Sequence, residues 1–417
     1  MDGDPAVEPE LDSFSLFLPL PYRIGVIFVL GIWAWGVNLQ YLSFLRIDVP
    51  ALIQYTSRSA TKDPAYLRTY RFAAIATLPL AVSIVLYWLI THGQASLVVA
   101  WDILPQSYLF LLAILFLVPY QKLSINGRYR FLSTLKRVSI GGIAEAGEGK
   151  FGDILLADVL TSYAKVLGDW FVAGCMFFSP GASSTDRPDR SCGGAYMVPL
   201  IIIVPSLIRL RQCLIEYSRV KMNPTAHSGW GGQHLANALK YSSAFPVVIL
   251  SAMQRGHDPA RYGMTETGLF RLWLLFVFIN SFYSFYWDVA KDWDLTLFSS
   301  ERDNPEHPWG LRRHTHFHTK EMYYGAIVID FMLRCTWSLK LSPHLDHFND
   351  LEGGIFVMEF LEVLRRWMWI FFRVETEWVR TNRGPLPDDI LMGDMNGSLD
   401  SPKSPDLPNP LSPRFPK

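Results

Sequence analysis

The sequence is poor in charge, poor in cysteine and free of any charge imbalance. Charged residues make up 18% of its 417 residues, against about 25% in a typical soluble chain. Lys and Arg total 38, as do Asp and Glu, so no broad basic surface for a nucleic acid is expected. Four cysteines are too few for a disulfide scaffold. Half of the residues are hydrophobic, which excludes a disordered chain and leaves a large apolar core or a membrane protein.

Long apolar runs decide between these two classes. A helix needs about 20 mainly apolar residues to cross the hydrocarbon layer of a bilayer. The runs 72–90 and 103–120 contain no charged residue, which argues against a soluble helical protein. We therefore expect an all-α fold, a polytopic membrane helix bundle in a lipid bilayer with about nine transmembrane helices. The nine candidate segments are 24–45, 72–90, 103–120, 153–178, 196–217, 234–253, 269–290, 322–341 and 355–378.

The loops between these segments predict the orientation. Lys and Arg accumulate after the first, third, fifth, seventh and ninth segments, and such residues mark the cytoplasmic side. The N-terminus is therefore predicted to face the lumen or exterior, and the C-terminus the cytosol. Cys175 and Cys192 flank a predicted lumenal loop, in a compartment that permits disulfides, and they are the candidate disulfide pair.

Ionisable side chains recur inside the later segments. Each costs at least about 2.5–3.5 kcal/mol to insert, which makes it a functional-site hypothesis. Arginine forks match phosphate or carboxylate oxygens, and nearby carboxylates would stop the cations from holding an anion too tightly. This pattern predicts a pathway for an oxyanion, with phosphate as the natural substrate. The cations are Lys240, Arg334, Arg366 and Arg373, and the carboxylates are Asp158, Asp288 and Asp330.

A structural role for the same residues stays open. Asp330 and Arg334 have the i,i+4 spacing of an intrahelical ion pair, as do Glu362 and Arg366. Arg209 could lie at the cytoplasmic interface and extend its charge into the headgroups. On this alternative, the charges only hold the bundle together.

A metal site has little support in the sequence. Three histidines alternate in one loop, as metal ligands on a strand would, but no fourth ligand is evident. They are His314, His316 and His318. No metal, no other cofactor and no catalytic residue is therefore expected. An enzyme that acts on phosphorylated lipids or sugars would need a nucleophile or a metal near the arginines, so the chain is not predicted to be an enzyme.

At these polar segments the sequence resembles the EXS family of membrane proteins. The matching words between residues 151 and 384 include LLADVL, PSLIRLRQCL, HLANALKYS, FYSFYWDVAKDWDL, YYGAIVIDFMLRCTWSL and LEVLRRWMWIFFRVETEW. The resemblance implies a helical bundle that moves inorganic phosphate. It implies that the anion is held by Lys240, Tyr241, Arg334, Arg365, Arg366 and Arg373. It also implies a pathway or gate that includes Asp158, Asp288 and Trp337, to which the residue pattern adds Asp330.

The short N-terminus sets this chain apart within the family it resembles. The exporter-like members begin with a cytosolic SPX domain that senses inositol pyrophosphates, whereas here about 22 residues precede the first segment and carry a net negative charge. The short form is similar to the fungal ER-retention-defective branch, which resides in the Golgi, and to the transmembrane part of the retrovirus-receptor branch. The resemblance implies a Golgi membrane transporter that returns phosphate released by glycosylation from lumen to cytosol. It would thereby support glycosylation and the retention of Golgi and ER residents.

One rival function and the domain boundaries complete the expectations. The rival is a non-transporting sorting adaptor that retains glycosyltransferases or lumenal ER proteins, with coat or adaptor proteins bound to its loops and tail. A homodimer rests only on the weak signal of Gly31 and Gly36 in the first segment. The expected parts are a lumenal N-terminus (1–22), N-terminal membrane helices (23–120), a basic amphipathic cytosolic connector (121–150), an EXS-like transport domain (151–383) and a disordered Pro/Ser-rich cytosolic tail (384–417).

Overall fold

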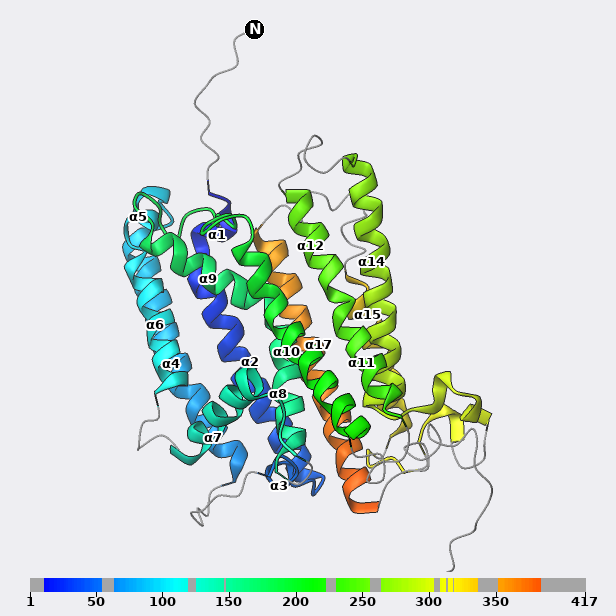
Figure 1. Cartoon of the computed structure of the whole chain (residues 1–417). Coiled ribbons are helices and arrows are strands. Elements are labelled where there is room, and N and C mark those ends of the chain that lie inside the picture. Colours follow the sequence, from blue (N-terminus) through cyan, green and yellow to red (C-terminus); the bar gives the residue numbers. More distant parts are fainter. Residues whose placement is uncertain are drawn as a thin grey trace, which may run out of the picture.

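A computed structural model describes ten ranges of the chain. They are residues 11–54, 64–118, 125–145, 148–222, 230–255, 264–303, 308–312, 314–317, 319–336 and 352–383. Within these ranges the backbone is helical and includes no strand, and the long helices run side by side in one bundle (Figure 1). The α-helices are α1 (Ser13–Phe17), α2 (Leu20–Phe44), α3 (Val49–Leu52), α4 (Ala65–Thr91), α5 (Ala95–Ala100), α6 (Ile103–Leu117), α7 (Ile125–Lys136), α8 (Lys150–Ser162), α9 (Ala164–Phe178), α10 (Met197–Met222), α11 (Gly232–Ser242), α12 (Ala244–Arg255), α14 (Glu266–Trp287), α15 (Lys320–Arg334) and α17 (Glu352–Arg383). Short 3₁₀ and π turns are η1 (Arg137–Gly141), η2 (Asp288–Asp292), η3 (Thr296–Phe298), η4 (Ser300–Asp303) and η5 (Pro308–Gly310).

Several helices are long and apolar enough to cross a bilayer. Among the described residues there are five: α2, α4, α10, the α11–α12 pair and α14 with the turn after it. The charge-free helix α6 is apolar but shorter. The all-α, polytopic membrane fold is therefore confirmed. The number nine stays a prediction. The three remaining candidate segments, 153–178, 322–341 and 355–378, fall on helices that are shorter or carry many charges.

Helix α17 explains how a charged helix can lie inside such a bundle. It packs against α2, α8 and α15, so protein rather than lipid surrounds it (Figure 1). Asn38 of α2 donates a hydrogen bond to the Trp367 carbonyl at 3.1 Å, and the Trp367 indole donates to the Ala34 carbonyl at 3.0 Å. Trp369 is fully buried in the largest apolar cluster. The charges of α17 consequently face other helices instead of hydrocarbon.

Three of the predicted membrane segments contain a break or a change of helix type. The segment 153–178, expected as one helix, breaks at Tyr163 into α8 and α9. The segment 234–253 breaks at Ser243 into α11 and α12. At Asp288 the α14 helix passes into the π turn η2. Interrupted helices and π turns recur at substrate and ion sites of transporters.

The glycines of α2 are used for packing within the chain. A Cβ at Gly31 would collide with the Tyr163 hydroxyl, and one at Gly36 would collide with the Tyr70 ring. Their close approach to tyrosines therefore accounts for the small residues that suggested a homodimer. A second copy would have to use another face.

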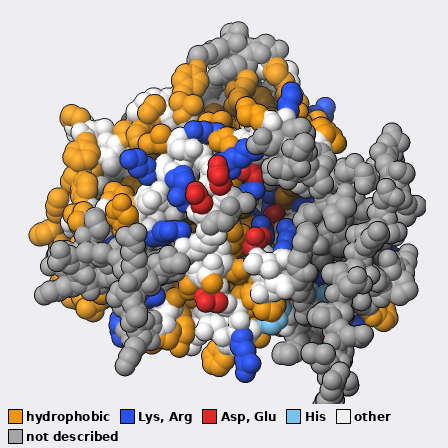
Figure 2. Space-filling model, turned by 60° about the horizontal axis from the view of Figure 1, so that its bottom comes forward, with side chains coloured by type: hydrophobic (Ala, Val, Ile, Leu, Met, Phe, Trp, Pro, Cys, Tyr) orange, Lys and Arg blue, Asp and Glu red, His pale blue; other side chains and the backbone are white. Residues whose placement is uncertain are grey.

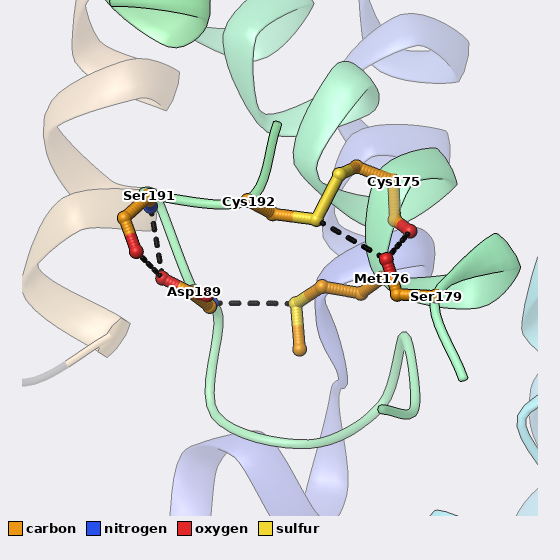
Figure 3. The surroundings of a disulfide bond; sticks show 6 residues. All are labelled: Cys175, Met176, Ser179, Asp189, Ser191 and Cys192. Carbon is orange, nitrogen blue, oxygen red and sulfur yellow. Dashed lines mark hydrogen bonds between the residues drawn. A yellow bond between two sulfur atoms is a disulfide. The ribbon is translucent and has the colours of Figure 1, made fainter. Parts of the chain in front are cut away.

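A disulfide lies at the end of the bundle where α9 finishes. Cys175 of α9 and Cys192 of the following loop are joined, with an S–S distance of 1.97 Å (Figure 3). In the same loop Arg190 donates to Glu352 at 2.7 Å, and Glu352 also accepts from Arg23 at 2.7 Å. These contacts fasten the loop over the starts of α2 and α17. This end is opposite to the end that carries α3 and α7 (Figure 1).

Candidate functional site

The buried charges of α8, α10 and α11 form the first part of the site. Asp158 accepts from the Tyr241 hydroxyl at 2.5 Å and forms an ion pair with Arg209 at 2.7 Å. The Arg209 guanidinium also lies over the Tyr241 ring, 4.8 Å from its centroid, and donates to Gln212 at 2.5 Å. Arg209 is only 4% exposed, so its charge depends on Asp158 for compensation.

Lys240 connects this group to the π turn. Its ammonium is 3.7 Å from an Asp292 carboxylate oxygen and lies over the Tyr241 and Trp287 rings, at 4.6 and 5.5 Å from their centroids. The π turn places Asp288 and Asp292 toward different cations, although they are four residues apart. A regular α-helix would put both carboxylates on one face, so the π turn separates their partners.

A second group joins η2 to α15 and α17. Asp288 accepts from Arg334 Nε at 3.1 Å and from Arg365 Nη1 at 3.2 Å, and Arg334 Nη2 is also paired with it. Asp330 contacts the same two arginines, at 3.3 and 3.2 Å. Two carboxylates and two guanidiniums thus alternate around one buried centre, and the expected Asp330–Arg334 pair is part of it.

Arg366 differs from the other cations of the site. Its Nε donates to Ser162 Oγ at 2.9 Å and its Nη2 to Thr161 Oγ1 at 3.3 Å. The guanidinium lies 4.5 Å from the Trp369 ring centroid. The alternative pairing of Glu362 with Arg366 is wrong, because Glu362 binds Arg365 through two hydrogen bonds of 2.6 and 3.0 Å. Within the described chain Arg366 has hydroxyl partners and no carboxylate partner, although it is 92% buried.

A polar cavity opens toward this site from the end that carries α3. Its volume is about 880 Å³, and we call it the vestibule. Figure 2 brings this end forward and shows acidic and basic side chains gathered near its middle, with hydrophobic ones toward the edges. Arg209, Arg373 and Asp292 line the vestibule, whereas Arg334 and Arg365 do not. The described lining of the vestibule therefore includes members of the first group and none of the inner group around Asp288.

Arg373 stands at the vestibule side of α17. It is buried, donates to Glu377 at 3.0 Å and lies over the Phe151 ring at 4.9 Å. Its Nε has no hydrogen-bond partner among the described groups. A buried donor without a partner is costly, so this nitrogen is available to an entering anion.

The structure brings together all but one of the predicted site residues. Seven of them lie on neighbouring helices in the network of ion pairs and hydrogen bonds described above: Asp158, Lys240, Tyr241, Asp288, Asp330, Arg334 and Arg365. Arg366 and Arg373 lie on α17 beside this network. Trp337 lies outside the described residues. Lys165 and Asp169 follow Asp158 at helical spacing in the sequence, but the break at Tyr163 separates them from it. Lys165 is exposed, and Asp169 pairs with Arg190 at 3.5 Å.

Two residues of the network were underrated from the sequence. Arg209 was placed at the interface, yet it is buried against Asp158. Glu362 was considered only as the partner of Arg366, yet it holds Arg365 and accepts from Ser162 at 2.9 Å. Among the described residues no group of three or more His, Cys, Asp or Glu side chains is placed to hold a metal ion.

These features define an α-helical multi-pass membrane protein with a buried network of paired charges on interrupted helices. A family model described as the EXS family matches residues 18–379, and the chain belongs to this family. Protein ERD1 homolog 2 of Schizosaccharomyces pombe is 29% identical over 389 residues, which cover 86% of this chain and 96% of the relative. Protein ERD1 homolog 1 of the same yeast is 30% identical over 383 residues, which cover 89% and 94%.

A longer relative matches through part of its length. Solute carrier family 53 member 1 of Mus terricolor is 30% identical over 282 residues. The matched region covers 64% of this chain and 38% of that protein. The relatives thus include both short proteins that align almost end to end and a longer protein named as a solute carrier.

Proposed function

We propose that this protein is a phosphate transporter of the Golgi membrane that moves inorganic phosphate from the lumen to the cytosol. The observation that carries the proposal is Arg366. It is a buried guanidinium, surrounded by the hydroxyl groups of Ser162 and Thr161, with no carboxylate bound to it among the described residues. A buried charge is costly unless it is paired, so the site favours an anion.

Phosphate suits the chemistry of this position. An arginine fork binds two oxygens of a tetrahedral oxyanion, and hydroxyl groups can donate to the remaining oxygens. Ser162 and Thr161 place hydroxyls next to Arg366. In this structure they donate to Glu362 and to the Asp158 carbonyl, and they would have to turn toward an arriving phosphate. A solute carrier among the relatives supports transport, and the resemblance described above supports phosphate as the solute.

The carboxylates explain how a bound anion could leave. Asp288 and Asp330 bind the same guanidiniums, Arg334 and Arg365, that an arriving phosphate would need. Each carboxylate therefore competes with phosphate, which keeps binding weak enough for release. In this structure both carboxylates pair with Arg334 and Arg365.

The disulfide and the vestibule support the proposed orientation of the chain in the membrane. Disulfides form in the secretory lumen, so the end with Cys175 and Cys192 is assigned to the lumen. The vestibule at the other end, with Lys150 and Arg380 in its lining, is assigned to the cytosol. The N-terminus is then lumenal and the C-terminus cytosolic. The two ERD1 homologs, which align over nearly their whole length, support a place in the secretory pathway.

Complementation in cells that lack the endogenous protein tests this function against the sorting adaptor. Arg366→Ala should fail to restore glycosylation although it reaches the Golgi, because the phosphate path is lost. A chain that ends after Arg383 should restore it. If Arg366→Ala restores glycosylation and the truncated chain does not, the tail carries the function and the adaptor is correct.

A further inference from the structure

A second large cavity lies between the N-terminal helices and the rest of the bundle. Its volume is about 870 Å³, and we call it the lateral cavity. Its walls come from α2, α3, α4, α6, α7, α8, α9 and α17. Ligand cavities typically have volumes of about 300–1,000 Å³. The lateral cavity is thus large enough to hold an extended molecule, and it is distinct from the vestibule.

The lining of the lateral cavity is apolar along most of its length. Phe28 and Leu39 of α2 lie 11 residues apart in its wall, which corresponds to about 16 Å along the helix. Other apolar lining residues include Leu156 and Leu167 of the opposite wall. An apolar slot of this length, parallel to a membrane helix, fits a hydrocarbon chain.

The charge in the lining has one sign. Six arginines line the lateral cavity, and no Asp or Glu is found among its described lining residues. Arg68, Arg71, Arg128 and Arg130 lie on α4 and α7, at the end of the bundle where α7 packs against α6 and α8 (Figure 1). Of the other two, Arg137 binds Asp153, and Arg366 donates to the hydroxyls of Ser162 and Thr161.

Arg128 indicates which kind of ligand the lateral cavity could bind. Its side chain is 91% buried and lies over the Phe72 ring, 5.0 Å from the centroid. Nη1 donates to the Val118 carbonyl at 3.1 Å, while Nη2 is buried without a hydrogen-bond partner among the described groups. An unpaired guanidinium donor at the polar end of an apolar slot is suited to bind an anion that carries a hydrocarbon chain.

We propose that the lateral cavity binds an anionic glycerophospholipid of the bilayer, with its phosphate at Arg128 and an acyl chain along α2 and α8. A phosphomonoester headgroup suits the site, because it is small and its oxygens match several arginine donors. Arg366 stands in the wall next to Val363 and Trp367. The bound acyl chain therefore lies beside the residue that carries the proposed transport site. Lipid binding itself does not depend on transport.

Native mass spectrometry of the purified full chain tests the proposal. The protein is extracted from phosphatidylcholine vesicles with or without a minor fraction of phosphatidic acid. The lipid that stays bound is then identified by its mass. Wild type should retain phosphatidic acid in preference to phosphatidylcholine. Arg128→Ala should reduce this retention about tenfold or more, as expected for a lost charge-assisted hydrogen bond. Lys136→Ala, which removes an exposed cation of the same helix outside the lining, should not change it.

A second variant keeps the test valid if Arg128→Ala does not fold. Thr134→Glu adds a carboxylate to the lining, where it can pair with the arginines and repel an anionic headgroup. It should abolish phosphatidic acid retention, whereas the neutral Thr134→Gln should keep it. Equal retention in Thr134→Glu and wild type would overturn the proposal. Retention of phosphatidylcholine alone, or release of the lipid by inorganic phosphate, would also overturn it.

Discussion

Replacing Asp288 by Asn should make the protein bind phosphate more tightly and transport it more slowly. Asp288 accepts from Arg334 at 3.1 Å and from Arg365 at 3.2 Å, so it competes with phosphate for both guanidiniums. Asn has nearly the same shape but no negative charge. The variant therefore removes the competitor and leaves the arginines in place.

The magnitude follows from the partners that remain. An ion pair at about 4 Å is worth about 4 kcal/mol at an effective dielectric constant of 20. Both arginines keep Asp330, so we expect a smaller change, about 1.5–3 kcal/mol, which is typical of a hydrogen bond to a charged group. This corresponds to roughly 10- to 100-fold tighter phosphate binding. Release then limits the flux, which should fall.

Two assays on the same preparation test this prediction. Phosphate affinity is measured by titration calorimetry in detergent, and flux is measured in liposomes. Asp153→Asn is the matched control: Asp153 is also fully buried and accepts from Arg137 Nε at 2.7 Å, but it lies outside the path. It should lower stability and leave phosphate affinity unchanged. If folded Asp288→Asn binds phosphate no better than wild type, the carboxylate does not compete for the arginines, and the reasoning fails.

Two further predictions concern Arg209 and the orientation. Arg209→Ala should lower the free energy of unfolding by about 3–5 kcal/mol, because it leaves Asp158 buried without its cation. The double variant Asp158→Asn/Arg209→Met removes both charges. It should recover most of the stability in thermal unfolding, but it should not recover the phosphate flux. Recovered flux would show that Arg209 is only structural. The second prediction concerns the orientation, in which Lys136 is cytosolic and Asp186 is lumenal. In sealed Golgi vesicles a membrane-impermeant maleimide should therefore label Lys136→Cys at once and Asp186→Cys only after permeabilisation. The reverse order of labelling would contradict the proposed orientation.

The bundle could be predicted from the sequence because lipid imposes a simple rule on its outer helices. The runs 72–90 and 103–120 are free of charge, and the helices α4 and α6 occupy them. Charged α17 was also found, since its apolar residues surround its charges at helical spacing. This rule does not predict where a membrane helix is interrupted. Tyr163 interrupts one segment with no proline or glycine next to it. The break at Ser243 does have a sequence signal, because Pro246 lacks the N–H that would bond the Ser242 carbonyl.

The site residues could be nominated from the sequence, but their pairing could not. Buried charges stand out against apolar segments, which is why Asp158, Asp288 and Arg334 were found. Glu362 pairs with Arg365 instead of Arg366 because both spacings are compatible with a helix, and the neighbouring helices decide between them. Arg209 was placed too near the interface because α10 continues to Met222, 13 residues further, which is about 20 Å of helix.

Phosphate flux with Arg366→Ala is the most direct test of the central claim. Purified protein is reconstituted into liposomes, and the movement of radiolabelled phosphate is followed for wild type, Arg366→Ala and Arg211→Ala. Arg366 binds no carboxylate among its described contacts, so its removal breaks no direct ion pair there, and the variant should fold. Arg211 is exposed and donates to the Ser139 carbonyl outside the path. We predict flux in wild type and Arg211→Ala and none in Arg366→Ala; equal flux in all three would contradict the proposed pathway.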